Sequence, residues 1–188
     1  MTIPIPFGWS AEGRVVSFSY IHPERSYELL ILPMSGDRQP TVFLGTPAYE
    51  GAGTVSPDGR WIAYHSNANG QFQIYVEQLP RSGTEWQITT RGGSRPRWRR
   101  DGRELYYLSP ANEVMAVDIS TAGDAVDFGV PHALFQVPFR ESPVQRNVFD
   151  VTADGQRFLV NTLVEGSRSG SITWVLNWAA DLVPGTAR

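Results

Sequence analysis

A tight turn followed by a short apolar strand occurs four times in this chain, and no other feature constrains the fold as strongly. In the clearest copy, Pro57 presets the first central φ of the turn near about −65°, Asp58 can bond to its own backbone, and Gly59 supplies the left-handed residue. The run Trp61–Tyr64 that follows shows no polar alternation, which is typical of a strand buried on both faces. The cassette therefore predicts a turn that leads into a buried β-strand.

The four copies are regularly spaced. Their turn glycines are separated by 46, 43 and 53 residues and are Gly13, Gly59, Gly102 and Gly155. A period of roughly 40–45 residues with several strands per unit is the signature of propeller blades. We therefore predict an all-β fold, a β-propeller of about four antiparallel four-stranded blades. The predicted blades cover residues 1–50, 51–93, 94–143 and 144–183 in approximate bounds, with a tail at 184–188.

Two blades are expected to depart from the regular pattern. Ser120–Pro131 predicts a long acidic loop in the third blade, and the fourth blade offers three strands instead of four. Those three are expected near Asn147–Thr152, Arg157–Asn161 and Ser171–Trp178. The six tryptophans are predicted to pack between sheets rather than to stack on a ligand, and they are Trp9, Trp61, Trp86, Trp98, Trp174 and Trp178.

Composition excludes several classes of function. The net charge of −3 gives no general attraction to nucleic acid or to anionic membranes, although all 16 basic residues are arginines. The absence of cysteine excludes disulfides, thiolate metal sites and cysteine nucleophiles. No apolar stretch approaches the roughly 20 residues that span a bilayer, so the chain as given is predicted to be soluble and not inserted in a membrane.

The cassettes resemble the TolB-type β-propeller repeat. The resemblance rests on the Ser-Pro-Asp-Gly turn with its aromatic strand, on Ile74-Tyr75-Val76, on Trp86-Gln87-Ile88-Thr89, and on the segment Gly92–Leu108. The end of the chain, Ile172–Trp178, resembles the C-terminus of propellers attached to bacterial transmembrane serine/threonine kinases and related regulators. This likeness implies a bacterial signalling protein, WD-repeat-like in its architecture, and an extracytoplasmic location if the chain is part of a receptor kinase. The compartment itself stays open.

Rings of this family usually have about six or more blades, within the general range of 4–8. About four blades leave three alternatives: the C-terminal part of a longer ring, a closed ring of four, or two chains that associate to complete one ring. An uncovered blade face would favour association, because large exposed apolar patches mark interaction sites.

One strand carries a concentration of arginines. With Pro96 and Trp98 on one face, the period of two places Arg95, Arg97 and Arg99 on the other. In the family that these repeats resemble, first strands line the central channel, so these three side chains are candidate channel-side ligands for a phosphate or an acidic peptide. The alternative is that they pair with nearby carboxylates or are solvated.

Three turn aspartates recur at equivalent positions, each followed by glycine: Asp58-Gly59, Asp101-Gly102 and Asp154-Gly155. Their role is predicted to be structural, because Asp followed by Gly suits the turn itself. A ring of carboxylates around a cation is the alternative, but the spacing of a calcium loop is absent.

No pattern indicates catalysis. The histidines His22, His65 and His132 stand apart, and Gly166–Gly170 has arginine where a nucleophile elbow has serine. No nucleotide fingerprint occurs either, so we expect no cofactor, no metal and no enzyme activity.

The function predicted from the sequence is a non-catalytic propeller module for protein or peptide binding and sensing, as the C-terminal part of a larger bacterial signalling propeller. The alternative is an accessory propeller that gates substrate entry to a prolyl-oligopeptidase-like hydrolase.

Overall fold

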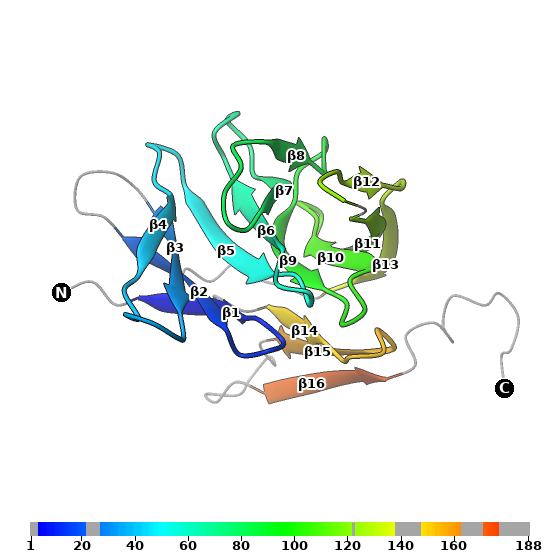
Figure 1. Ribbon diagram of the computed structural model, residues 1–188. Coiled ribbons are helices and arrows are strands. Elements are labelled where there is room, and N and C mark those ends of the chain that lie inside the picture. The colour runs from blue at the N-terminus through cyan, green and yellow to red at the C-terminus, as the bar shows by residue number, and fades with distance from the viewer. Residues whose placement is uncertain (1–3, 22–26, 122, 138–147, 163–170, 177–188) are drawn as a thin grey trace, which may run out of the picture.

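The computed structural model describes residues 4–21, 27–121, 123–137, 148–162 and 171–176, and every regular element in these ranges is a β-strand. The strands form four antiparallel sheets that follow one another in an arc, shown in Figure 1. The predicted all-β propeller fold is confirmed. No closed ring is seen among the described strands. No helix in the described ranges is long and apolar enough to cross a membrane.

Blades 1 and 2 are regular four-stranded sheets in which spatial order follows chain order. Blade 1 consists of β1 (Ile5–Trp9), β2 (Val15–Ile21), β3 (Tyr27–Pro33) and β4 (Thr41–Leu44). Blade 2 consists of β5 (Glu50–Val55), β6 (Trp61–Ser66), β7 (Gln73–Gln78) and β8 (Glu85–Gln87).

Blade 3 differs from the expectation at its outer edge. Its strands are β9 (Ser94–Trp98), β10 (Glu104–Leu108), β11 (Glu113–Ser120), β12 (Asp127–Phe128) and β13 (His132–Gln136). Both β12 and β13 pair with β11. The segment predicted as a loop therefore contains a short strand, because the buried side chain of Val126 holds this segment against the core between blades 2 and 3.

Blade 4 is a three-stranded sheet of β14 (Phe149–Val151), β15 (Arg157–Thr162) and β16 (Ser171–Leu176). The expectations for Asn147 and for 177–178 lie outside the described residues, as does the tail at 184–188.

An apolar core lies at each of the three contacts between successive blades. Leu29 and Ile31 of blade 1 pack with Tyr64 of blade 2, and Trp61 of blade 2 packs in one cluster with Leu105 of blade 3. Tyr106 of blade 3 contacts Phe158 of blade 4 edge-on, with ring centroids 5.2 Å apart. Burial of aromatic and branched side chains between sheets is thus the main stabilising contribution.

The face that a blade turns toward the preceding blade is called here its leading face. Alignment on the turn glycines places Trp9, Val55 and Trp98 at one equivalent leading-face position of blades 1, 2 and 3. Val55 and Trp98 are 6% and 8% exposed, whereas Trp9 is 65% exposed. The prediction that every tryptophan packs between sheets is therefore wrong for Trp9, because no described blade covers it.

Other side chains on the leading face of blade 1 are likewise more exposed than their equivalents in blade 2. Val16 and Phe18 are half-buried, whereas their equivalents in blade 2, Ile62 and Tyr64, are fully buried. Blade 1 therefore presents the kind of face that blades 2 and 3 bury against a neighbour.

Candidate functional site

Strand β9 has the alternation expected from its sequence. Pro96 and Trp98 are buried, while Arg95, Arg97 and Arg99 are half-buried. The indole Nε1 of Trp98 donates to the carbonyl oxygen of Thr54 on β5 at 3.0 Å. This bond joins the first strands of blades 2 and 3 and fixes the position from which the arginines project.

Arg95 lies at a bulge in β9. Its φ is +56°, and the pairing with β10 shifts register there, which re-aims the side chain. Ala52, the equivalent residue of β5, has a φ of +50° in a similar register shift. The bulge lets the Arg95 backbone N–H donate to Nδ1 of His65 at 3.3 Å.

His65 is a buried neutral acceptor behind this strand. Burial, and secondarily the charges of Arg95 and Arg97, lower the pKa of His65 to about 3. Because Nδ1 accepts a hydrogen bond, the proton of the neutral ring resides on Nε2. That Nε2 and the Oγ of Ser19 are buried and have no hydrogen-bond partner among the described residues, and both lie close to Gly51.

Arg97 is more enclosed than Arg99, whose side chain is 31% exposed. The side chain of Arg97 is 11% exposed, and its Nη1 donates to the carbonyl oxygen of Pro96 at 2.9 Å. Its Nε lies 4.0 Å from Oδ1 of Asp150 on β14. Burial lowers the pKa of Arg97, and the charge of Asp150 opposes that shift. An additional negative charge beside this guanidinium would therefore be stabilising.

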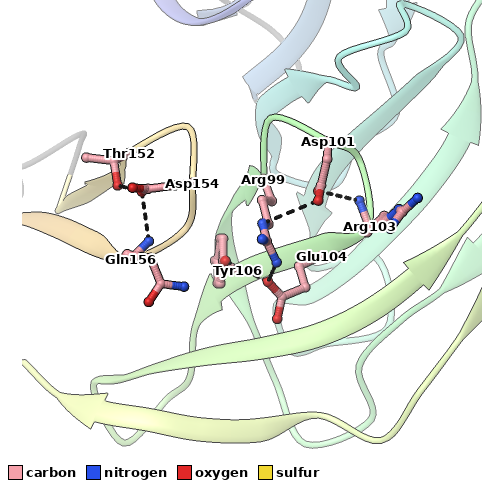
Figure 2. A network of polar contacts seen from close by, with 8 residues as sticks. All are labelled: Arg99, Asp101, Arg103, Glu104, Tyr106, Thr152, Asp154 and Gln156. Atoms are coloured by element: carbon pink, nitrogen blue, oxygen red, sulfur yellow. Dashed lines mark hydrogen bonds and ion pairs between the residues drawn. The ribbon is translucent and has the colours of Figure 1, made fainter. Parts of the chain in front are cut away.

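Arg99 is held by carboxylates at the end of the strand, as Figure 2 shows. Its Nη1 lies 2.8 Å from Oε2 of Glu104, and its Nε lies 3.5 Å from Oδ2 of Asp101. The hydroxyl of Tyr106 donates to the same Glu104 oxygen at 2.8 Å. The hydrogen bond to Glu104 raises the pKa of Arg99. This guanidinium braces the turn and packs beside Gly155 of blade 4.

The three turn aspartates each bond within their own turn. Oδ1 of Asp58 accepts from the backbone N–H of Arg60 at 3.1 Å, and Oδ1 of Asp101 accepts from that of Arg103 at 3.0 Å. In Figure 2, Asp154 accepts from Gln156 at 3.0 Å in the same way. The following glycines Gly59, Gly102 and Gly155 have φ values of +75°, +73° and +73°.

The turns keep these carboxylates apart. No group of three His, Cys, Asp or Glu side chains suited to a metal ion occurs in the described part of the chain. A hydroxyl also supports the turn in blades 2 and 4, because Ser56 and Thr152 donate to Asp58 and Asp154. Arg99 takes the position of that hydroxyl in blade 3, where it pairs with Asp101 and also with Glu104.

Asp150 and His65 are site residues that sequence reasoning missed. When blades 3 and 4 are aligned on their turn glycines Gly102 and Gly155, Asp150 of blade 4 takes the position of Arg97 of blade 3. The turn spacing alone could therefore have identified Asp150. Nothing in the sequence marks the bond between His65 and Arg95, because it depends on the bulge.

Four successive antiparallel sheets with buried contacts between them define a β-propeller assembly. No family model matches the chain, and no curated protein matches it either. Among solved structures, TolB from Acinetobacter baumannii is similar with a TM-score of 0.69 at 22% identity, covering 94% of this chain and 41% of that chain.

Two further propellers show how widely the fold is shared. The β-propeller domain of Myceliophteria thermophila Cps50 (Swd1) is similar with a TM-score of 0.51 at 11% identity, over 88% of this chain and 67% of that one. An oligogalacturonate lyase in complex with manganese has a TM-score of 0.53 at 11% identity, over 90% of this chain and 64% of that one. These likenesses show the fold, and function must be argued from the site.

Proposed function

We propose that this chain is a non-catalytic module within a larger bacterial signalling propeller. It binds a protein or peptide partner by contacting acidic groups of that partner. The observation that carries the binding role is the position of Arg95 and Arg97. Both are half-buried on a first strand, and burial lowers the pKa of Arg97 despite the nearby Asp150. An acidic peptide would supply the charge that offsets this desolvation.

The test is anion-induced thermal stabilisation. Hexaglutamate peptide at about five times its Kd should raise the Tm of the chain by about 2–4 °C. Inorganic phosphate is the second probe. Arg95→Ala combined with Arg97→Ala should abolish both shifts, whereas Arg91→Ala with Arg100→Ala, two exposed arginines near the same strand, should leave them in place. Equal shifts in the two double variants would remove Arg95 and Arg97 from the proposal.

The leading face of blade 1, which none of the described strands covers, supports membership in a larger ring. Its equivalents in blades 2 and 3 are buried by a preceding blade, and the chain spans 41% of the TolB chain that it resembles. We infer that preceding blades of the same polypeptide cover Trp9 and Phe18 in the working protein.

Native mass in solution tests this second part. The isolated chain should be a monomer of 20.9 kDa, because the proposal assigns the covering of Trp9 and Phe18 to preceding blades of the same polypeptide and not to a second copy. A stable species of twice that mass, converted to monomer by Phe18→Asp, would show instead that two copies complete the ring. Val130→Asp is the matched control, since Val130 is 87% exposed in another blade.

A further inference from the structure

An open groove of about 600 Å³ lies between blades 1 and 2, at the end of the sheets that carries the turn glycines. Its apolar lining includes Val15 and Ile31 of blade 1 and Leu79 of blade 2. Val42 also lines the groove and is 55% exposed. Arg14 stands at the blade 1 side.

An equivalent position lies one blade further along, between blades 2 and 3, and is called here the second groove. Three backbone bonds mark the matching positions, from the N–H groups of Met34, Leu79 and Ile119 to the carbonyl oxygens of Arg14, Arg60 and Arg103, respectively. Blade 2 therefore contributes Arg60 to the second groove where blade 1 contributes Arg14 to the first. Likewise Ile119 of blade 3 takes the place of Leu79.

The chain fills this second groove with its own segment 123–126. Arg60 donates from Nη2 to the carbonyl oxygen of Gly123, and Gln78 donates from Nε2 to Oδ1 of Asp124 at 2.9 Å. Val126 is 5% exposed and completes the core there. Its cluster includes Trp61, Val76 and Ile119.

The first groove keeps this apolar character but has smaller side chains at two equivalent positions. Strand register and the turns place Val15 where blade 2 has Trp61, and Thr41 where blade 2 has Trp86. The chain cannot fill it in the same way, because the connection between β7 and β8 is only 79–84, whereas 121–131 connects β11 to β13.

Charge at the first groove favours an acidic occupant. Three arginines, Arg14, Arg60 and Arg81, and one acidic residue, Asp58, are among its described lining residues. Arg14 pairs with Glu12 and Arg81 pairs with Glu77, whereas Arg60 donates to the neutral carbonyl of Gly123 in the segment that fills the second groove. Among the described residues, no carboxylate forms an ion pair with Arg60.

We propose that the groove between blades 1 and 2 binds a short extended segment of a partner protein, with one branched apolar side chain beside a carboxylate, as in Asp124–Val126. The inference rests on the proposed function as a peptide-binding module, and it assigns a site separate from Arg95 and Arg97. The apolar side chain packs against Val15, Ile31 and Leu79, and the carboxylate faces the arginines.

The probe is the chain's own groove-filling sequence, made as the acetylated and amidated peptide Gly-Asp-Ala-Val-Asp-Phe with a fluorescent label. Its binding to the full chain is followed by fluorescence anisotropy in a titration. We expect saturable binding. Val42→Glu should weaken it at least about tenfold, because it brings a like charge to the peptide's carboxylates and a polar group to the apolar wall. Val130→Glu, the same change at an exposed site outside the groove, should leave binding unchanged.

Two further controls separate the charge from the apolar contact. Arg14→Gln should weaken binding several-fold while Arg100→Gln does not, and a peptide with serine in place of its valine should bind at least about tenfold more weakly. Absence of saturable binding, or equal affinity of the Val42→Glu and Val130→Glu proteins, would overturn the groove proposal. Hexaglutamate stabilisation measured on the same proteins shows whether the proposed function stands when the groove proposal fails.

Discussion

Trp98→Ala should lower the free energy of unfolding by about 3–5 kcal/mol, the usual cost of deleting a buried aromatic side chain. Trp98 is 8% exposed, and its indole donates to Thr54 across the contact between blades 2 and 3. The substitution removes that bond and leaves a cavity between the two sheets. Urea unfolding followed by circular dichroism measures the change.

Trp9→Ala is the matched control, because Trp9 occupies the equivalent position of blade 1 and is 65% exposed. In the isolated chain this change should cost less than about 1 kcal/mol, as most exposed substitutions do. Similar losses at the two positions would mean that a neighbour already covers Trp9 in solution, which would contradict the open leading face.

His65→Leu should remove part of the acid sensitivity of the fold. Burial, aided by Arg95 and Arg97, lowers the pKa of His65 to about 3, while the unfolded chain binds its proton near pH 6.5. The unfolded state therefore binds more protons between these values, and stability falls as the pH drops below 6.5. Between pH 6.5 and 4.5 the native chain should lose about 2 kcal/mol more than the variant.

Leucine is the natural replacement because Leu108 occupies the equivalent buried position of blade 3. Chemical denaturation at a series of pH values gives the two profiles. His132→Leu, at an exposed histidine, should retain the native profile. If the His65→Leu and native profiles run parallel, His65 titrates normally and is not the buried neutral acceptor described above.

The architecture could be predicted because its determinants are local and repeated. Each of the four turns, three Asp-Gly and one Glu-Gly, needs a left-handed glycine, and their spacing sets the spacing of the blades. The alternation of Pro96 and Trp98 with the arginines likewise follows from the period of a strand. These features require no knowledge of how one blade sits on the next.

The details of the site depend on contacts between blades, which local patterns do not contain. Asp150 approaches Arg97 only because successive first strands lie side by side, and Arg95 reaches His65 through a bulge at a non-glycine residue. The sequence likewise did not distinguish Arg99, which braces a turn, from its two neighbours on the strand. The assignment of Arg95 and Arg97 to ligand binding stays a prediction that the proposed titration tests.

Segment 123–126 of blade 3 crosses onto blade 2, and this contact affects the order in which the blades unfold. In repeat proteins, each unit is coupled mainly to its nearest neighbours, so differences between successive interfaces set the order of unfolding. Blades 2 and 3 are joined by their apolar core and also by the bonds of Arg60 and Gln78 to this segment. Blades 1 and 4 each have a single described interface. They are therefore the units expected to detach first, leaving blades 2 and 3 as the last cooperative pair.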